Sequence, residues 1–201
     1  MRNIEKIREE LDKALTFLDY ENAFHLIKEG LRYAQLSQNL FYEYFFYSQL
    51  AILNEDFEEA IKYLDKALKI NPYDEHCYND KALCLADLGN AEEALRCIEE
   101  GLKKCSDSKM LYQNRGWILL QKGDYQKAIL NLKKSLEFDD TYSVAWANLA
   151  ECLKHEADFK TALKYYKKSL SLIPKKYKDL IKEIKDQISK ISKVIERRND
   201  K

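Results

Sequence analysis

The chain has 201 residues, of which 46% are apolar and 34% are charged, and this composition excludes an intrinsically disordered protein. The 34 basic and 34 acidic side chains cancel, which removes the overall positive charge typical of a nucleic-acid-binding protein. Five Gly and two Pro leave few helix breakers, so long helices are expected. The N-terminal segment has no apolar run that suits a signal peptide, and the five cysteines form no CxxC pair. We therefore expect a cytoplasmic protein with reduced cysteines.

Residues 1–40 are predicted to form a first, irregular helical hairpin. The segment 19–23 (DYENA) carries a turn signal, because an aspartate can accept the free amide hydrogens at the start of a helix. Gly30 adds a small residue of the kind found where helices pack closely. Ala23 lies 37 residues before its counterpart Ala60, so about three extra residues lengthen the connection to the next unit. We therefore expect a degenerate unit at this end.

From residue 41 onward, small residues recur at a fixed interval of 34 positions. A second small residue follows each of the repeated alanines by seven positions, and a third precedes it by twelve. Small side chains at fixed places allow the backbones of packed helices to approach each other without a clash. The interval therefore predicts a stack of similar helical hairpins. The repeated alanines are Ala60, Ala94, Ala128 and Ala162.

A polar turn separates the two helices of each predicted hairpin. Its Asp or Asn side chain can accept the amide hydrogens of the following helix. Pro72 and Pro174 end the second helix in two of the units, because proline interrupts a helix. Each unit is therefore a helix, a turn and a helix. The predicted N-cap residues are Asp56, Asn90, Asp124 and Asp158.

Two segments, 123–128 (GDYQKA) and 146–150 (WANLA), resemble the tetratricopeptide repeat, whose pattern combines an aromatic residue, Leu-Gly, a Gly-Asp-Tyr turn, two alanines and a closing proline. The resemblance implies an all-α fold: a right-handed solenoid of about five antiparallel helical hairpins plus a C-terminal capping helix, in one continuous domain. The expected parts are a degenerate hairpin at 1–40, repeats at 41–74, 75–108, 109–142 and 143–176, and an amphipathic capping helix at 177–201.

The last predicted helix has one apolar face, with Tyr177 and five isoleucines spaced alternately by four and three residues from 177 to 195. A helix of this kind can cover the exposed core of the final repeat. The same spacing also suits a coiled coil, so a homodimer through residues 177–198 is the alternative. Residues 160–201 carry 14 Lys and Arg against 5 Asp and Glu. This basic end allows a second hypothesis, that it binds nucleic acid or an anionic membrane.

In tetratricopeptide repeats the first helix of each pair lines a concave groove, and the resemblance places a partner-binding groove at the matching positions. This surface is rich in aromatic and amide side chains and has almost no cations, so a carboxylate-clamp chaperone tail is not expected as its ligand. Asn114 and Asn148 occupy the same place in successive repeats, where carboxamides could pair with the backbone of an extended peptide or simply follow the family pattern. A core role for Phe45 and Trp117 stays open. The predicted groove residues are Tyr42, Phe45, Gln49, His76, Asn79, Asp80, Leu83, Met110, Gln113, Asn114, Trp117, Ala147, Asn148, Glu151 and His155.

No catalytic residue, cofactor or metal site is predicted. His25, His76 and His155 have no metal-ligand spacing to other candidate ligands, and the sequence lacks a phosphate-binding glycine loop or a nucleophile elbow. The sequence therefore predicts a non-catalytic scaffold or adaptor that binds a peptide segment or helix of a partner protein. The alternatives are nucleic-acid or membrane binding by the basic C-terminal helix, and homodimerisation.

Overall fold

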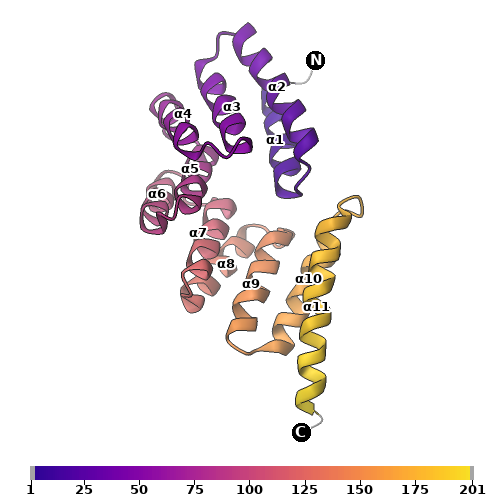
Figure 1. The fold of residues 1–201 in the computed structure, drawn as a ribbon. Helices are drawn as coiled ribbons and strands as arrows, with labels where there is room; N and C mark the ends of the chain where they lie inside the picture. Colours follow the sequence, from indigo (N-terminus) through magenta and orange to yellow (C-terminus); the bar gives the residue numbers. More distant parts are fainter. Residues whose placement is uncertain (1–2, 200–201) are drawn as a thin grey trace. The chain divides into compact units, whose positions relative to one another are not determined.

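The computed structural model describes residues 3–199, and within this range helices are the only regular secondary structure (Figure 1). Short turns connect successive helices. The helices are α1 (Ile4–Thr16), α2 (Tyr20–Leu36), α3 (Leu40–Leu53), α4 (Phe57–Ile70), α5 (Glu75–Asp87), α6 (Ala91–Lys104), α7 (Lys109–Gln121), α8 (Tyr125–Phe138), α9 (Ser143–His155), α10 (Phe159–Leu172) and α11 (Lys178–Asn199).

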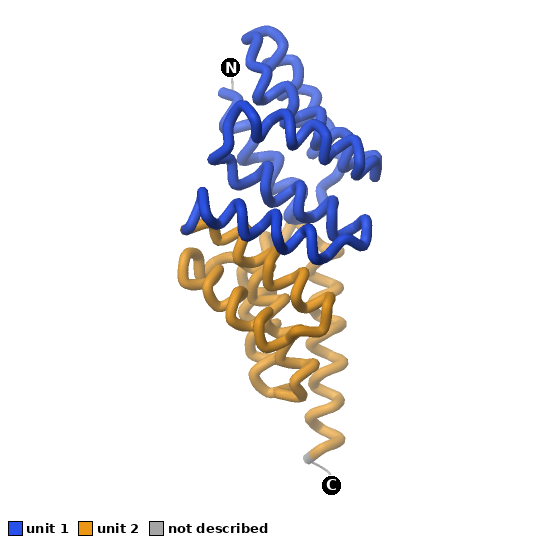
Figure 2. The backbone as a smooth tube through the Cα atoms, turned by 90° about the vertical axis from the view of Figure 1, so that its left-hand side faces the viewer, with its two compact units in different colours: residues 1–106 blue, residues 107–201 orange. Residues whose placement is uncertain are grey.

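The chain divides into two compact units (Figure 2). Unit 1 comprises residues 1–106 and contains α1 to α6, and unit 2 comprises residues 107–201 and contains α7 to α11. Within each unit every helix packs against the next one along the chain. This consecutive packing of helical hairpins confirms the predicted all-α hairpin architecture.

The predicted turn residues start the second helix of each hairpin. The carboxylates of Asp56, Asp124 and Asp158 each accept a hydrogen bond from an amide nitrogen three residues later, at 3.2–3.3 Å. Asn90 occupies the same place but makes no side-chain cap hydrogen bond. The residue immediately before each cap has a positive φ, which glycine adopts without strain; in these turns it is Glu55, Gly89, Gly123 and Ala157.

The repeated small residues lie where helices approach most closely. All four repeated alanines are fully buried. A Cβ atom added to Gly30 of α2 would lie 2.3 Å from the Phe46 ring of α3, and one added to Gly116 of α7 would lie 2.6 Å from Leu132 of α8. The small side chains therefore set the packing distance between neighbouring helices, as their spacing predicted.

The last helix, α11, packs against α10 and buries Ile184 and Ile191, as expected of a capping helix. Ile181 and Ile188 on the same face are half-buried. Over the described residues, no helix combines the length and apolar character that a membrane crossing requires.

Candidate functional site

The predicted groove residues are divided between the two units. Seven belong to unit 1, and we refer to them as the α3–α5 set. Eight belong to unit 2, and we refer to them as the α7–α9 set. The α3–α5 set is Tyr42, Phe45, Gln49, His76, Asn79, Asp80 and Leu83. The α7–α9 set is Met110, Gln113, Asn114, Trp117, Ala147, Asn148, Glu151 and His155.

The aromatic members of the α3–α5 set are buried. Phe45 is 1% exposed and Tyr42 is 8% exposed, and both belong to the hydrophobic core that α1 and α3 share. The Arg8 guanidinium of α1 lies 4.3 Å from the centre of the Phe45 ring, a cation–π contact. The Phe45 ring is therefore covered within unit 1 and offers no surface to a partner.

A buried ion pair joins α1 to the start of α5. The Nη2 of Arg8 donates to Oδ1 of Asp74 at 2.5 Å, and both side chains are 8% exposed. The same Asp74 oxygen caps α5 by accepting from the amide of Cys77 at 2.9 Å. Burial alone would raise the pKa of Asp74, but the hydrogen bond and charge of Arg8 lower it below its usual value.

Sequence reasoning missed Arg8, although a signal was present. Arg8 lies fifteen residues before Ala23, and Phe45 and Asn79 lie fifteen residues before Ala60 and Ala94. Applying the repeat register to the degenerate first unit would therefore have placed Arg8 among the groove positions.

Two further side chains of α1 bond to the α3–α5 set. The Tyr42 hydroxyl donates to the carboxylate of Glu5, and His76 Nδ1 lies 3.0 Å from Oδ2 of Asp12. Burial alone would lower the pKa of His76, but the hydrogen bond with Asp12 raises it above its usual value. The first helix thus forms ionic and hydrogen-bonded contacts with both other helices of this surface.

The remaining polar members of the α3–α5 set bond to one another. Gln49 Nε2 donates to one carboxylate oxygen of Asp80 at 2.6 Å, and Asn79 Nδ2 donates to the other at 3.1 Å. Burial raises the pKa of Asp80 to about 6. Both carboxylate oxygens of Asp80 therefore accept hydrogen bonds from side chains of unit 1.

The α7–α9 set differs because its one large aromatic side chain, Trp117, is partly accessible, whereas Tyr42 and Phe45 of the α3–α5 set are buried; Leu83 of the α3–α5 set is half-buried. Gln113 and Asn114 are buried, whereas Met110, Trp117 and Ala147 are half-buried. Asn148 is also half-buried, but its Nδ2 atom is buried without a hydrogen-bond partner among the described residues. The buried Asn148 amide group is therefore an unsatisfied hydrogen-bond donor.

The charged members of the α7–α9 set lie at the end of α9. Glu151 accepts a hydrogen bond from the Tyr166 hydroxyl, pairs with Lys154 and lies 3.3 Å from Nε2 of His155. Burial alone would raise the pKa of Glu151, but the hydrogen bonds from Lys154 and Tyr166 lower it. The Tyr125 ring stacks on His155 at 4.6 Å. These contacts hold the Glu151 and His155 side chains in place at the C-terminal end of α9.

The side chains that the structure describes form no metal-binding site. Within residues 3–199, no three or more His, Cys, Asp or Glu side chains are arranged to hold a metal ion. Burial raises the pKa of both Cys97 and Cys152 to about 12, so these thiols stay protonated near neutral pH and are poor nucleophiles.

Solved structures of helical-repeat proteins share this fold. A thermophilic TPR protein of Thermus thermophilus, TTC0263, aligns with a TM-score of 0.74 and 18% identity, covering 94% of this chain and 98% of that chain. Residues 41 to the end of MamA from Desulfovibrio magneticus RS-1 align with a TM-score of 0.58 and 21% identity, covering 81% and 98%. The first TPR of Spaghetti (RPAP3), bound to the HSP90 peptide SRMEEVD, aligns with a TM-score of 0.55 and 18% identity, covering 60% and 92%. At these identities the likeness shows the fold.

A family model supplies the assignment that the solved structures leave open. No curated protein matches the sequence. The family described as "Tetratricopeptide repeat" matches residues 51–109 and 119–184, which together make up more than half of the chain. This match confirms the resemblance that the repeated alanines and the turn motifs indicated. The chain belongs to the tetratricopeptide repeat family.

Proposed function

We propose that this protein is a non-catalytic interaction scaffold that binds a peptide segment or helix of a partner protein on the α7–α9 set of unit 2. The tetratricopeptide fold supports a scaffold for protein–protein interaction, and proteins of this family are generally non-catalytic. The first TPR of RPAP3 holds a peptide from another protein. The observation that carries the choice of surface is the unpartnered amide donor of Asn148.

A bound peptide would satisfy that donor. A buried amide without a partner costs about 1–3 kcal/mol, and a change of rotamer would let the half-buried Asn148 side chain donate to a backbone carbonyl of the peptide. Trp117, on the neighbouring helix α7, would then anchor an apolar side chain, since tryptophan is enriched among residues that dominate binding energy. Together these residues suit an extended or apolar segment.

The α3–α5 set is the weaker candidate for the same role. Its Asp80 carboxylate is bonded to Gln49 and Asn79, and its Phe45 ring lies under Arg8. A peptide could bind there only by displacing contacts that already exist inside unit 1. Binding on unit 2 requires no such exchange.

The proposed ligand is not an anionic chain end. The α7–α9 set contains no Lys or Arg, and the nearby Lys154 is paired with Glu151. A terminal carboxylate placed there would be desolvated without a cation, which is unfavourable. The proposed partner segment is therefore neutral or apolar.

The test begins with peptides selected by display on the immobilised full-length protein, whose affinity is then measured by calorimetry. The variant Trp117→Ala with Asn148→Ala should weaken binding by about 30-fold or more, which corresponds to loss of one interface anchor of about 2 kcal/mol. A matched control truncates an apolar residue and a neighbouring asparagine elsewhere in unit 2: Leu130→Ala with Asn131→Ala on α8, where Leu130 is exposed.

The two variants give distinct outcomes. Loss of affinity in the α7–α9 variant with an unchanged α8 variant supports this surface. Equal affinity of both variants would place the site elsewhere, and a protein that selects no peptide at all would contradict the scaffold function itself.

A further inference from the structure

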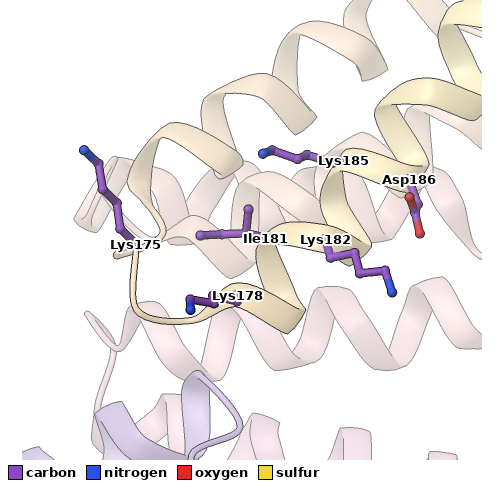
Figure 3. Close-up of a pocket in the computed structure, with 6 residues that line it drawn as sticks. All are labelled: Lys175, Lys178, Ile181, Lys182, Lys185 and Asp186. Carbon is purple, nitrogen blue, oxygen red and sulfur yellow. The ribbon is translucent and has the colours of Figure 1, made fainter.

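A concave feature lies where the chain enters α11, and none of the residues of the proposed peptide site line it. It is a pocket of about 510 Å³ that opens to solvent. Figure 3 shows its lining side chains on the loop before α11 and on the first turns of the helix. The lining residues are Lys175, Lys178, Ile181, Lys182, Lys185 and Asp186.

The four lysines of this pocket differ from several lysines elsewhere in the described chain that are held in ion pairs. Lys81 pairs with Asp65 at 2.6 Å, and Lys127 pairs with Asp124 at 2.8 Å. The pocket lysines form no ion pair with any residue between 3 and 199, although Asp186 also lines the pocket. The pocket is therefore lined by four cations and one carboxylate.

The placement of these lysines makes the pocket electropositive. Lys178, Lys182 and Lys185 are separated by four and three residues, which puts them on one face of α11. The N-terminal end of a helix adds partial positive charge, and a concave surface focuses the field of its charges. The like charges of the four lysines repel one another, and a bound anion would relieve that repulsion.

We propose that this pocket binds a compact cluster of phosphate groups, either free in solution or carried by a lipid headgroup. Every cation in the pocket is a lysine, whose compact point charge commonly binds phosphate groups. The cations span one loop and two helical turns, which matches a compact polyanion better than the extended phosphate track of a nucleic acid. Ile181 supplies an apolar side to the pocket (Figure 3).

If the phosphates belong to a lipid, the pocket would bind only the lipid headgroup. Among the residues from 139 to 199 that the structure describes, no large hydrophobic side chain is strongly exposed. The pocket therefore has no neighbouring apolar anchor to insert into a bilayer, and it would recognise only the phosphates at the membrane surface.

The test uses the full chain and inorganic tripolyphosphate as the probe, with calorimetry at low and moderate salt. The variant Lys178→Gln with Lys182→Gln should weaken binding about tenfold or more, and added salt should weaken wild-type binding. The matched control is Lys164→Gln with Lys168→Gln: it removes the same charge from exposed positions of α10 that do not line the pocket, and should change the affinity by less than about twofold.

Separate arms distinguish the sources of phosphate. Vesicles that contain a phosphatidylinositol bisphosphate test the lipid source, with phosphatidylserine vesicles of equal total charge and duplex DNA as comparisons. Binding to tripolyphosphate alone supports a free ligand, and additional preference for the bisphosphate lipid supports a headgroup. The proposal is overturned if tripolyphosphate does not bind, if both lysine pairs matter equally, or if DNA or phosphatidylserine binds as well as the clustered phosphates. Loss of peptide binding would leave this test unaffected.

Discussion

The Arg8 guanidinium and the Asp74 carboxylate form a buried ion pair across 66 residues of sequence, at 2.5 Å. The pair links the first helix of unit 1 to the first turn of α5, and Arg8 also lies over the Phe45 ring. Through this one side chain, Arg8 therefore joins α1, α3 and α5, the first helices of the three hairpins in unit 1.

Replacement of Arg8 by Met should destabilise unit 1 strongly. The change leaves the buried Asp74 carboxylate without its cation, and breaking one side of a buried pair costs about 3–5 kcal/mol. Urea unfolding followed by circular dichroism measures the free energy of unfolding. Exposed Arg96, which lies 3.4 Å from Glu93, is the matched control, and its replacement by Met should cost less than about 1 kcal/mol.

A second substitution separates the charge from the packing. Adding Asp74→Ser to Arg8→Met removes the unpaired carboxylate but keeps an N-cap oxygen for α5, so it should recover part of the lost stability. If the double variant is less stable than Arg8→Met alone, the buried charge is not the cause of the loss.

The stability of unit 1 should fall as the pH rises from about 4 to 6. Burial raises the pKa of Asp80 to about 6 in the folded state, while the unfolded value stays near 3.8, so the folded protein binds more protons in this interval. The Asp80→Asn variant should lose this dependence. Unfolding in urea at several pH values measures it, and an unchanged slope in the variant would assign the effect to another group.

His76 should add a second loss of stability at higher pH. The hydrogen bond with Asp12 raises its pKa above the usual 6.5, so its contribution is fully present below that value and disappears as the pH rises through the folded pKa. His76→Gln should flatten the stability profile above about pH 6.5. Proton NMR of the imidazole provides a direct check, because a pKa below 6.5 would contradict the ion pair.

Replacement of Gly116 by Ala should destabilise unit 2. In an exposed helix this change stabilises by about 1 kcal/mol, but here the added Cβ would lie 2.6 Å from Leu132. Overpacking of this kind costs about 1–3 kcal/mol, so we expect a lower melting temperature. Gly89→Ala is an informative comparison: a Cβ there meets nothing within 4 Å, so any cost comes from its φ of 80° alone. A rise in melting temperature for Gly116→Ala would show that α7 and α8 can separate easily.

Truncation of the buried isoleucines of α11 should loosen the cap. Ile184→Ala and Ile191→Ala each remove a buried side chain and should cost about 2–4 kcal/mol in thermal or urea unfolding. Truncation of the half-buried Ile188 should lower the free energy of unfolding by less. Light scattering of the wild type gives the second readout. Because Ile184 and Ile191 are already buried by the same chain, we expect a monomer. A dimer that dissociates when these isoleucines are truncated would support the coiled coil through 177–198.

Sequence alone was sufficient for features that depend on neighbouring residues. The 34-residue interval predicted the buried alanines, and Asp56, Asp124 and Asp158 were correctly identified as helix caps. A cap bonds to an amide only three residues away, and a small residue is needed wherever the next helix packs. Both requirements are met by residues close in the chain, so their pattern is readable without coordinates.

The state of the proposed site was decided by tertiary structure. The repeat register identifies the helix face on which Phe45, Asp80 and Asn148 lie, but it does not determine what covers them. Phe45 is covered by Arg8 from a degenerate unit, whereas the Asn148 amide lacks a partner. Such differences arise from contacts between residues far apart in sequence, whose distances depend on how the helices pack. The sequence determined the helices and their order, and packing decided which polar groups are paired inside the protein and which remain unpaired.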